Sequence, residues 1–506
     1  MPAGVGALLS GNRYNWAYTS DPEPYLNNRK IATPRGKTLG GSSSINGMVY
    51  IRGHACDYDA WAAKGCRGWD YAHVLPYFKR SEAHEMGADR YHGANGHLRV
   101  TAGRPEGPLD RAFIAAGEQA GYPRTDDVNG YCQEGFGRLD RTTCTGRRWS
   151  TARGYLAEAQ QRPNLTVVTH AHVHKVVCEH ETAVGVVYEH GGDVVKVRAE
   201  GETLLCGGAI NSPQLLQLSG IGPPDTLRGL DIPVVVGLAG VGRNLADHPD
   251  TVVAYRCKKP VSVYRWATPP GKWLAGARWF MTHSGVAASN QFESVGFIRT
   301  RPGVKHPDVQ LTFMPLAIRP GRTECLRMHA FQVHIDLMRP TSRGAVELRD
   351  NDPYSPPGIL FNYLQTERDR DDMRTAARLV REIVRQPAFR DLRGEEILPG
   401  EGVRDDARLD TWARQITETG YHACGTCRMG PETDPQAVVD EQLRVFGVDR
   451  LRVVDASVMP EIVSGNTNAP TVMIAEKASD MIMGGPPLSP AEAPAWIHPE
   501  WRNVQR

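Results

Sequence analysis

The sequence predicts a mixed α/β protein of at least two domains, one of which is interrupted by the other. Residues 203–222 and 451–482 each have the pattern of a strand, a turn or polar loop, and a helix. Between them, residues 251–400 combine strand-like segments with one long amphipathic helix. With 506 residues, 41% of them hydrophobic, the chain is long enough to divide into domains with separate cores.

Composition excludes several classes of protein. Lys and Arg (59) nearly balance Asp and Glu (57), which argues against nucleic acid as a partner. No apolar run approaches the ~18 residues of a membrane-spanning helix. The first residues, MPAGVGALLSGNRYNW, lack the basic and apolar regions of a signal peptide. Ten cysteines without such a signal predict reduced thiols and a cytoplasmic location.

The first informative stretch is 34–58, PRGKTLGGSSSINGMVYIRGHACDY. Its glycines permit tight turns and close approach of the backbone to a ligand, and Ser42 and Asn46 add short hydrogen-bonding groups. A run of Gly and Ser is more often a linker. The apolar, extended MVYIRG that follows makes a linker less favoured here, so the stretch is a candidate cradle for a phosphate or a flat ring.

Helices are expected at 61–81 and 110–121, and strands at 164–177, 183–189 and 193–199. Residues 126–155 form a long irregular segment, which is typical of a functional loop. His170, His172 and His174 alternate along one strand and therefore share a face. A solvated strand face is favoured over zinc, because no carboxylate or cysteine accompanies them. In 203–222, Ser212 is expected to cap the helix and Pro213 to begin it.

The insertion at 251–400 predicts a sheet-plus-helix domain. Segments 286–298, 308–318 and 342–349 resemble strands, and 366–385 has a helical apolar stripe.

The segment 421–430, YHACGTCRMG, concentrates reactive residue types. Cys424 and Cys427 have the spacing of a redox pair or half a zinc site, but no second pair exists, so packing is favoured. A lone histidine is more often structural than catalytic, and His422 depends on its neighbours for a role. In 451–482, a polar loop with Asn466 lies between a strand and a helix expected from Pro470. Such a helix N-terminus favours an anion or cofactor.

A dinucleotide-binding G-x-G-x-x-G between a strand and a helix is not found. The candidates at 4–6, 220–222 and 240–242 each lack the strand, the helix or the third glycine.

Taken together, these stretches resemble a known family. PRGKTLGGSSSINGMVYIRGHACDYD and GAINSPQLLQLSGIG are similar to two signatures of the glucose–methanol–choline (GMC) flavin oxidoreductases. YHACGTCRMG and VVDASVMPEIVSGNTNAPTVMIAEKASDMI resemble the family's C-terminal flavin and active-site segments. The resemblance covers nearly the whole chain. RYNWAY, GYPRTDDVNGYCQEGFG, RRWSTARGYL and GVAASNQFESVGFIR look most like its bacterial choline-oxidising members.

The resemblance implies FAD and the residues that hold it. Ile45 stands where some relatives have a histidine that attaches FAD, so non-covalent binding is expected. Gly40, Gly41, Ser42 and Asn46 are expected along the isoalloxazine and pyrophosphate, and Val173 at the adenosine. Asp455 and Ala456 are expected at the ribitol and pyrophosphate, and Asn468 and Pro470 at the helix that faces the flavin.

The resemblance also implies an active site without metal. His422 matches the catalytic base and Asn466 its hydrogen-bonding companion, although Ala423 replaces the usual proline. Glu293 falls where choline-oxidising relatives place a carboxylate, and Phe292 and Phe313 are expected to add cation–π attraction. For Glu293, an ordinary surface strand carboxylate is an equal alternative.

The implied function is FAD-dependent oxidation of choline, a small alcohol, to betaine aldehyde and onward to glycine betaine. Hydride would pass to flavin N5, with a quinone or the respiratory chain as acceptor, in the cytoplasm or peripherally at the inner membrane. Alternatives are another primary alcohol, or a remnant unable to hold FAD. The fold expected by resemblance is an FAD-binding Rossmann-like domain that lacks its N-terminal glycine-rich βαβ unit, through either a mis-called start or a real truncation. A real truncation would give the remnant. The expected organisation is 1–250 and 401–484 for that domain, 251–400 for the substrate domain, and a wrapping or disordered tail at 485–506.

Overall fold

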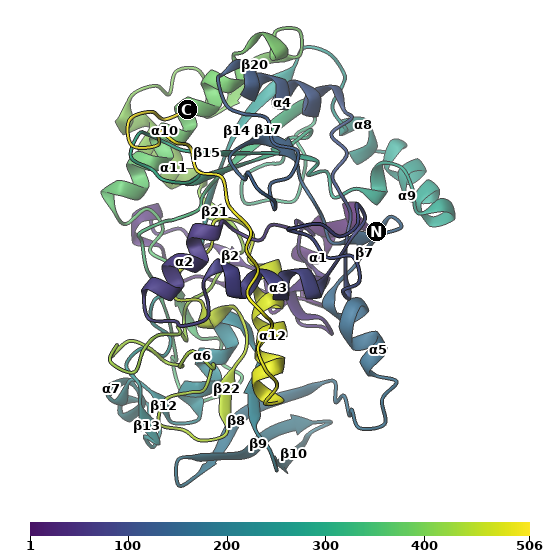
Figure 1. Ribbon diagram of the computed structural model, residues 1–506. Coiled ribbons are helices and arrows are strands. Elements are labelled where there is room, and N and C mark those ends of the chain that lie inside the picture. Colours follow the sequence, from purple (N-terminus) through teal and green to yellow (C-terminus); the bar gives the residue numbers. More distant parts are fainter.

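The computed structural model describes all 506 residues. A seven-stranded antiparallel sheet forms its upper half in Figure 1. The strands run in the order β20-β14-β17-β16-β15-β5, and β21 pairs with β14. Their bounds are β5 Gly135–Arg138, β14 Pro249–Cys257, β15 Ser294–Ile298, β16 Val309–Met314, β17 Ala330–Leu337, β20 Arg393–Leu398 and β21 Glu418–Thr419. Since β5 and β21 lie outside 251–400, this sheet draws on chain beyond the expected substrate domain.

Helices cover one face of this sheet and bury its larger apolar side chains. They are α4 Pro108–Gln119, α10 Glu367–Val384 and α11 Asp406–Ile416. Helix α10 begins where the sequence predicts, because the Thr366 hydroxyl accepts the N–H of Asp369 as an N-cap. Side chains alternate along a strand. Leu311, Phe313 and Val333 therefore pack toward these helices, while their strand neighbours face the other way.

The lower half has its own core around parallel strands and helices. Strands β11 (Thr203–Leu205) and β22 (Leu451–Val453) pair in parallel, although they are distant in sequence. Beside them a three-stranded antiparallel sheet contains β8 Ala171–Glu179, β9 Thr182–His190 and β10 Asp193–Arg198. The helices of this half are α2 Ala55–Ala63, α3 Tyr71–Ser81, α6 Gly208–Leu218 and α12 Asn468–Ile482.

Several element boundaries differ from the sequence expectation, among them the strand expected at 164–177, which is β8 at Ala171–Glu179, and the one expected at 286–298, which is β15 at Ser294–Ile298. Residues 61–81 form parts of two helices, because α2 ends at Ala63 and α3 starts at Tyr71. Helix α6 begins at Gly208, so Ser212 lies inside it, where its hydroxyl accepts the N–H of Gly207. Helix α12 begins two residues before Pro470.

Short elements complete the chain. They are α1 Val5–Leu9, β1 Tyr18–Thr19, β2 Ala32–Thr33, β3 Glu82–His84, β4 Leu98–Val100, β6 Thr143–Cys144, β7 Arg147–Arg148, α5 Ala157–Ala159, β12 Ile221–Gly222, α7 Pro224–Gly229, β13 Val236–Gly237, α8 Tyr264–Ala267, α9 Gly271–Thr282, β18 Ala345–Glu347 and β19 Gly358–Leu360.

The C-terminal tail wraps over both halves, which is one of its two expected states (Figure 1). The N–H of Leu488 donates to the Tyr77 hydroxyl, and Arg299 donates to the carbonyl of Val504. No helix has the length and apolar character required to cross a bilayer.

Candidate functional site

A cavity of about 1820 Å³ lies between the two halves and is lined by residues of both. Ordinary ligand pockets measure roughly 300–1,000 Å³. This cavity therefore has room for a dinucleotide cofactor together with a small substrate.

Most of the residues expected to hold the cofactor line this cavity: Gly40, Gly41, Ser42, Asn46, Val173, Asp455, Ala456 and Asn468. Gly41 and Gly208 have positive φ, and a Cβ on either would meet no atom within 4 Å. The backbone is thus left open to a ligand at these two points. At α12, Thr467 forms no side-chain cap, so the first N–H groups of the helix are free to meet an electron-rich group. These features fit a bound FAD.

Asp455 anchors the walls of this part of the cavity. Its carboxylate accepts the N–H of Gly208, the hydroxyl of Ser212 and the N–H of Ser457, at 2.9, 2.6 and 2.8 Å.

The position of Pro470 differs from the expectation that it contacts the cofactor. Because α12 starts earlier than expected, Pro470 is buried in the helix and does not line the cavity.

His422 and Asn466 meet in the cavity wall, although they come from separate loops. The Asn466 amide Nδ2 lies 2.8 Å from His422 Nε2, and Asn466 Oδ1 accepts from Gln310 Nε2 at 3.3 Å. His422 Nδ1 lies 3.0 Å from Nδ1 of His248, whose Nε2 donates to the carbonyl of Met338 at 3.1 Å. With His248 protonated at Nε2, His422 must carry its proton on Nδ1, which leaves its Nε2 as the acceptor.

Burial, with smaller effects from His248 and Arg35, lowers the pKa of His422 well below its usual range. The imidazole is therefore neutral and able to accept a proton. Asp247 fixes the loop, because its carboxylate accepts the N–H of His422 at 2.7 Å and the hydroxyl of Tyr363 at 2.5 Å.

The cavity face of the large sheet is polar. Asp250 of β14 lies directly opposite Asp336 of β17. His334 Nδ1 donates to Asp250 Oδ2 at 2.8 Å. The other oxygen, Oδ1, is buried and has no hydrogen-bond partner. Burial, followed by the charges of Asp250 and Asp247, raises the pKa of Asp336 well above its usual value.

Two residues expected at the substrate site, Glu293 and Phe313, do not line the cavity. The Glu293 carboxylate is bound by Arg141, by the Ser289 hydroxyl and by the N–H of Arg104, and it does not line the cavity. Phe313 points to the opposite face of β16, where it stacks on Phe113 with ring centroids 4.8 Å apart.

Phe292, by contrast, lines the cavity, and its ring lies edge to face with His334. Sequence reasoning missed Asp250 and Asp336. The signal was available in FQVHIDL of β17, where polar residues alternate within an otherwise apolar strand.

The other candidate clusters have structural partners. Cys424 and Cys427 are fully buried in the apolar core of the lower half. His172 contacts the carbonyl of Pro353, and His174 contacts the hydroxyl of Tyr354, so two of the three aligned histidines are engaged by the chain itself.

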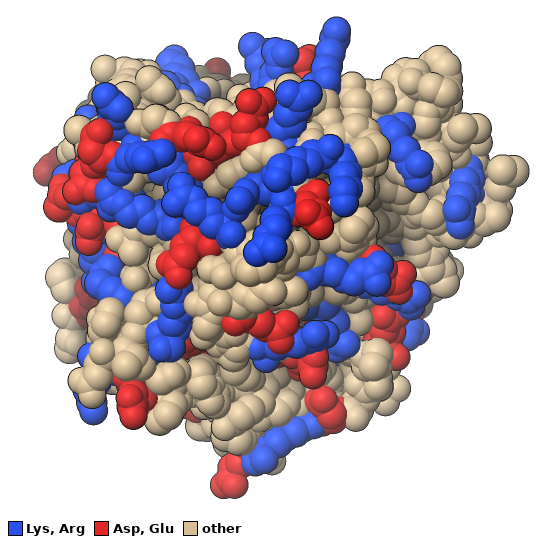
Figure 2. Space-filling model, turned by 90° about the horizontal axis from the view of Figure 1, so that it is seen from above, with Lys and Arg blue, Asp and Glu red and all other residues tan.

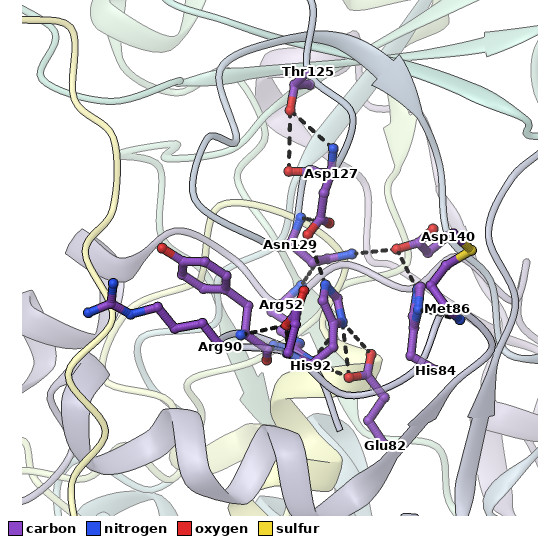
Figure 3. Close-up of polar contacts among 12 residues, drawn as sticks. Arg52, Glu82, His84, Met86, Arg90, His92, Thr125, Asp127, Asn129 and Asp140 are labelled. Atoms are coloured by element: carbon purple, nitrogen blue, oxygen red, sulfur yellow. Dashed lines mark hydrogen bonds and ion pairs between the residues drawn. The ribbon is translucent and has the colours of Figure 1, made fainter. Parts of the chain in front are cut away.

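A second buried polar cluster lies outside the cavity (Figure 3). His92 is held between Glu82, at 3.1 Å from Nδ1, and Asp127, at 2.8 Å from Nε2. Burial lowers the pKa of His92, but hydrogen bonds to Asp127 and Glu82 outweigh it and raise the pKa to about 9.

Glu82, His84 and His92 bring metal-binding atoms within 4.8 Å of one another. The Arg52 guanidinium already neutralises Glu82, and His84 contacts Asp140. This cluster therefore supplies its own cations, and the structure gives no reason to place a metal there.

The fold and the cavity together define a protein with room for a dinucleotide cofactor between its two halves. Family models described as GMC oxidoreductase match residues 5–250 and 340–475. A protein of Chromohalobacter salexigens called oxygen-dependent choline dehydrogenase 1 is 50% identical over 98% of this chain and 89% of its own. A protein of Sinorhizobium fredii called oxygen-dependent choline dehydrogenase is 48% identical over 100% of this chain and 92% of its own.

Solved structures agree with this assignment. Pyridoxine 4-oxidase from Mesorbium loti superposes with a TM-score of 0.85 at 31% identity, covering 96% of this chain and 91% of that one. A formate oxidase superposes with a TM-score of 0.87 at 26% identity, covering 96% and 90%. The chain belongs to the GMC oxidoreductase family, and its cofactor is FAD.

Proposed function

We propose that this protein oxidises choline to betaine aldehyde, and the aldehyde onward to glycine betaine. The observation that carries the proposal is the carboxylate of Asp250 at the cavity wall, whose side chain is 16% exposed and whose Oδ1 receives no hydrogen bond from the protein. A carboxylate oxygen left without a donor is stabilised by a cation. The relatives named as choline dehydrogenases point to the same substrate.

The cation would lie between Asp250 and Phe292. His334 connects them, because it donates to Asp250 and contacts the Phe292 ring. A quaternary ammonium offers no hydrogen bond, so a carboxylate and an aromatic face are the groups that replace its hydration. Burial beside Asp250 keeps Asp336 neutral. The pair of carboxyl groups therefore carries one negative charge, which matches the single positive charge of choline.

The alcohol end would lie at His422 and Asn466. His422 Nε2, which accepts an N–H of Asn466 in this structure, would take the hydroxyl proton once the alcohol replaces that donor, and the Nδ1–H bond to His248 keeps Nε2 as the acceptor. The Asn466 amide donates toward the same point and stabilises alkoxide character on the oxygen. Bound FAD supplies a hydride acceptor. Gln310 fixes the amide orientation by donating to Asn466 Oδ1.

Asp250→Asn tests the cation site, because it keeps the size of the side chain and removes its charge. The apparent affinity for choline should fall about ten- to a hundredfold, as expected for a charge-assisted contact. The affinity for 3,3-dimethylbutan-1-ol, the neutral isostere, should change much less. Glu293→Gln is the matched control and should not discriminate between the two alcohols. Equal weakening of both substrates by Asp250→Asn would favour the second candidate, a GMC dehydrogenase for another primary alcohol.

We propose further that FAD is bound without a covalent link. Ile45 lines the cavity with an unreactive side chain where some relatives attach the cofactor. Acid precipitation should release all flavin into the supernatant, and flavin retained by the pellet would contradict this.

The electron acceptor is proposed to be a respiratory quinone. The names of the relatives specify oxygen, so the test is a direct competition. Turnover with a soluble quinone under nitrogen should exceed the rate of oxygen consumption in air.

All ten cysteines are free thiols, which suits a cytoplasmic location.

A further inference from the structure

Helix α9 carries an apolar stripe that no other part of the chain covers. Its four large members are Trp273, Leu274, Phe280 and Met281, with 69%, 61%, 80% and 77% of their surfaces exposed. Their spacing, together with the exposed Ala277, places all five on one side of the helix. Scattered exposed apolar residues are ordinary, but a continuous stripe of this kind marks an interaction surface.

The chain segment that carries this stripe has basic residues and no acidic ones. Residues 251–292 contain six Lys and Arg residues and no Asp or Glu. Arg265, Lys272 and Arg278 belong to α8, α9 and their connection, and none of the three has an ion-pair partner. The lobe on the right of Figure 2, where α8 and α9 lie in Figure 1, accordingly shows blue on tan without red.

The inner side of the same helix belongs to the cavity wall. Lys272, Ala275 and Gly276 line the cavity, and the indole N–H of Trp279 donates to the carbonyl of Gly146 at 2.7 Å. The stripe and the cavity are therefore opposite sides of one helix.

We propose that α9 is a docking helix for an anionic phospholipid surface. Aromatic and aliphatic side chains on one side of a helix, with unpaired cations beside them, are the features of a helix that lies in a membrane interface. Its twelve residues span about 18 Å, so it would lie along the surface rather than cross it. Docked in this way, α9 would place the wall of the substrate cavity against the bilayer.

Charge decides between a bilayer and a second copy of the chain. A two-fold dimer through α9 would set this acid-free segment against itself, with like charges facing each other. An anionic bilayer neutralises them.

Flotation of the purified protein with lipid vesicles tests the proposal. Vesicles of equal parts phosphatidylglycerol and phosphatidylcholine should carry the protein upward, and those of phosphatidylcholine alone at least tenfold less. Raising the NaCl concentration should weaken the binding, because surface charges are screened. Phe280→Ser combined with Met281→Ser should reduce flotation at least tenfold. Met483→Ser, at a residue 80% exposed elsewhere on the surface, is the matched control and should leave flotation unchanged.

Failure of the wild-type protein to float, or equal flotation of the double variant, would overturn the proposal. So would a wild-type dimer on size-exclusion chromatography that the double variant converts to a monomer, with no vesicle binding by either. Flotation requires no turnover, so this result is separate from that of choline oxidation.

Discussion

His422 and His92 are both buried histidines in polar clusters, yet they are held in opposite charge states. His92 has a carboxylate at each ring nitrogen, and its pKa is raised to about 9. His422 has a neutral imidazole at one nitrogen and an amide at the other, and its pKa is lowered well below the usual range. The difference shows that burial alone does not determine the charge. The partners at the two nitrogens do.

The two charge states suit different roles. A protonated His92 contributes cationic character to a cluster that joins β3 to the loop containing Asp127 (Figure 3). A neutral His422 presents a lone pair to the cavity and is suited to proton transfer. The following three changes test this contrast, beginning with the largest expected effect.

Replacing His422 with Ala should lower kcat by a factor of about 10² or more, because the acceptor for the hydroxyl proton is removed. The variant should still bind FAD, as seen from its absorbance spectrum. His92→Gln is the comparison, and its kcat per folded molecule should remain close to that of the wild type. Near-normal turnover of His422→Ala would assign the base to another residue.

The charged state of His92 should be lost at high pH, whereas the neutral state of His422 should be lost only at low pH. The pKa of His92 is raised on folding, so its stabilisation is complete below about pH 6.5 and is lost as pH rises through about 9. The loss is roughly 3 kcal/mol of unfolding free energy at most. Denaturant titrations between pH 6 and 10 should show this decline in the wild type and a smaller one in His92→Gln.

Because the pKa of His422 is depressed, it stays neutral below pH 6.5. Activity should therefore persist into mildly acidic buffer, and kcat/KM should fall only as pH approaches the lowered pKa. A decline centred at the ordinary histidine value would contradict the neutral state assigned to His422.

The smallest effect is expected at the two cysteines near His422. Burial raises the pKa of Cys424 to about 12 and that of Cys427 well above its usual value, so both are inert thiols. Changing both to Ser should leave kcat within about twofold and release no metal, a magnitude typical of packing residues remote from the chemistry. Stoichiometric zinc in the wild-type protein would make the pair part of a metal site and contradict this prediction.

Local patterns in the sequence predict what depends on neighbouring residues. The stripe and threonine cap of α10 are local, and the helix forms where they indicate. The strand, loop and helix of 451–482 are likewise predicted, because their signals are periodicity and a proline near the helix start. The motifs shared with the family also place His422 and Asn466 in one site, and the structure brings them within 2.8 Å.

The sequence could not identify the carboxylate that faces the cavity. Glu293 and Asp250 both stand at or near the start of a strand, and neither carries a local sign of what it meets. Arg141, which is distant in sequence, forms an ion pair with Glu293. The pleat of β14, by contrast, turns Asp250 toward the cavity and leaves one of its oxygens without a hydrogen-bond partner. Alternation along a strand is a local property, but which face becomes core and which becomes cavity depends on the helices that cover the sheet. Only the tertiary structure decides that, since it alone places residues more than a hundred positions apart in contact.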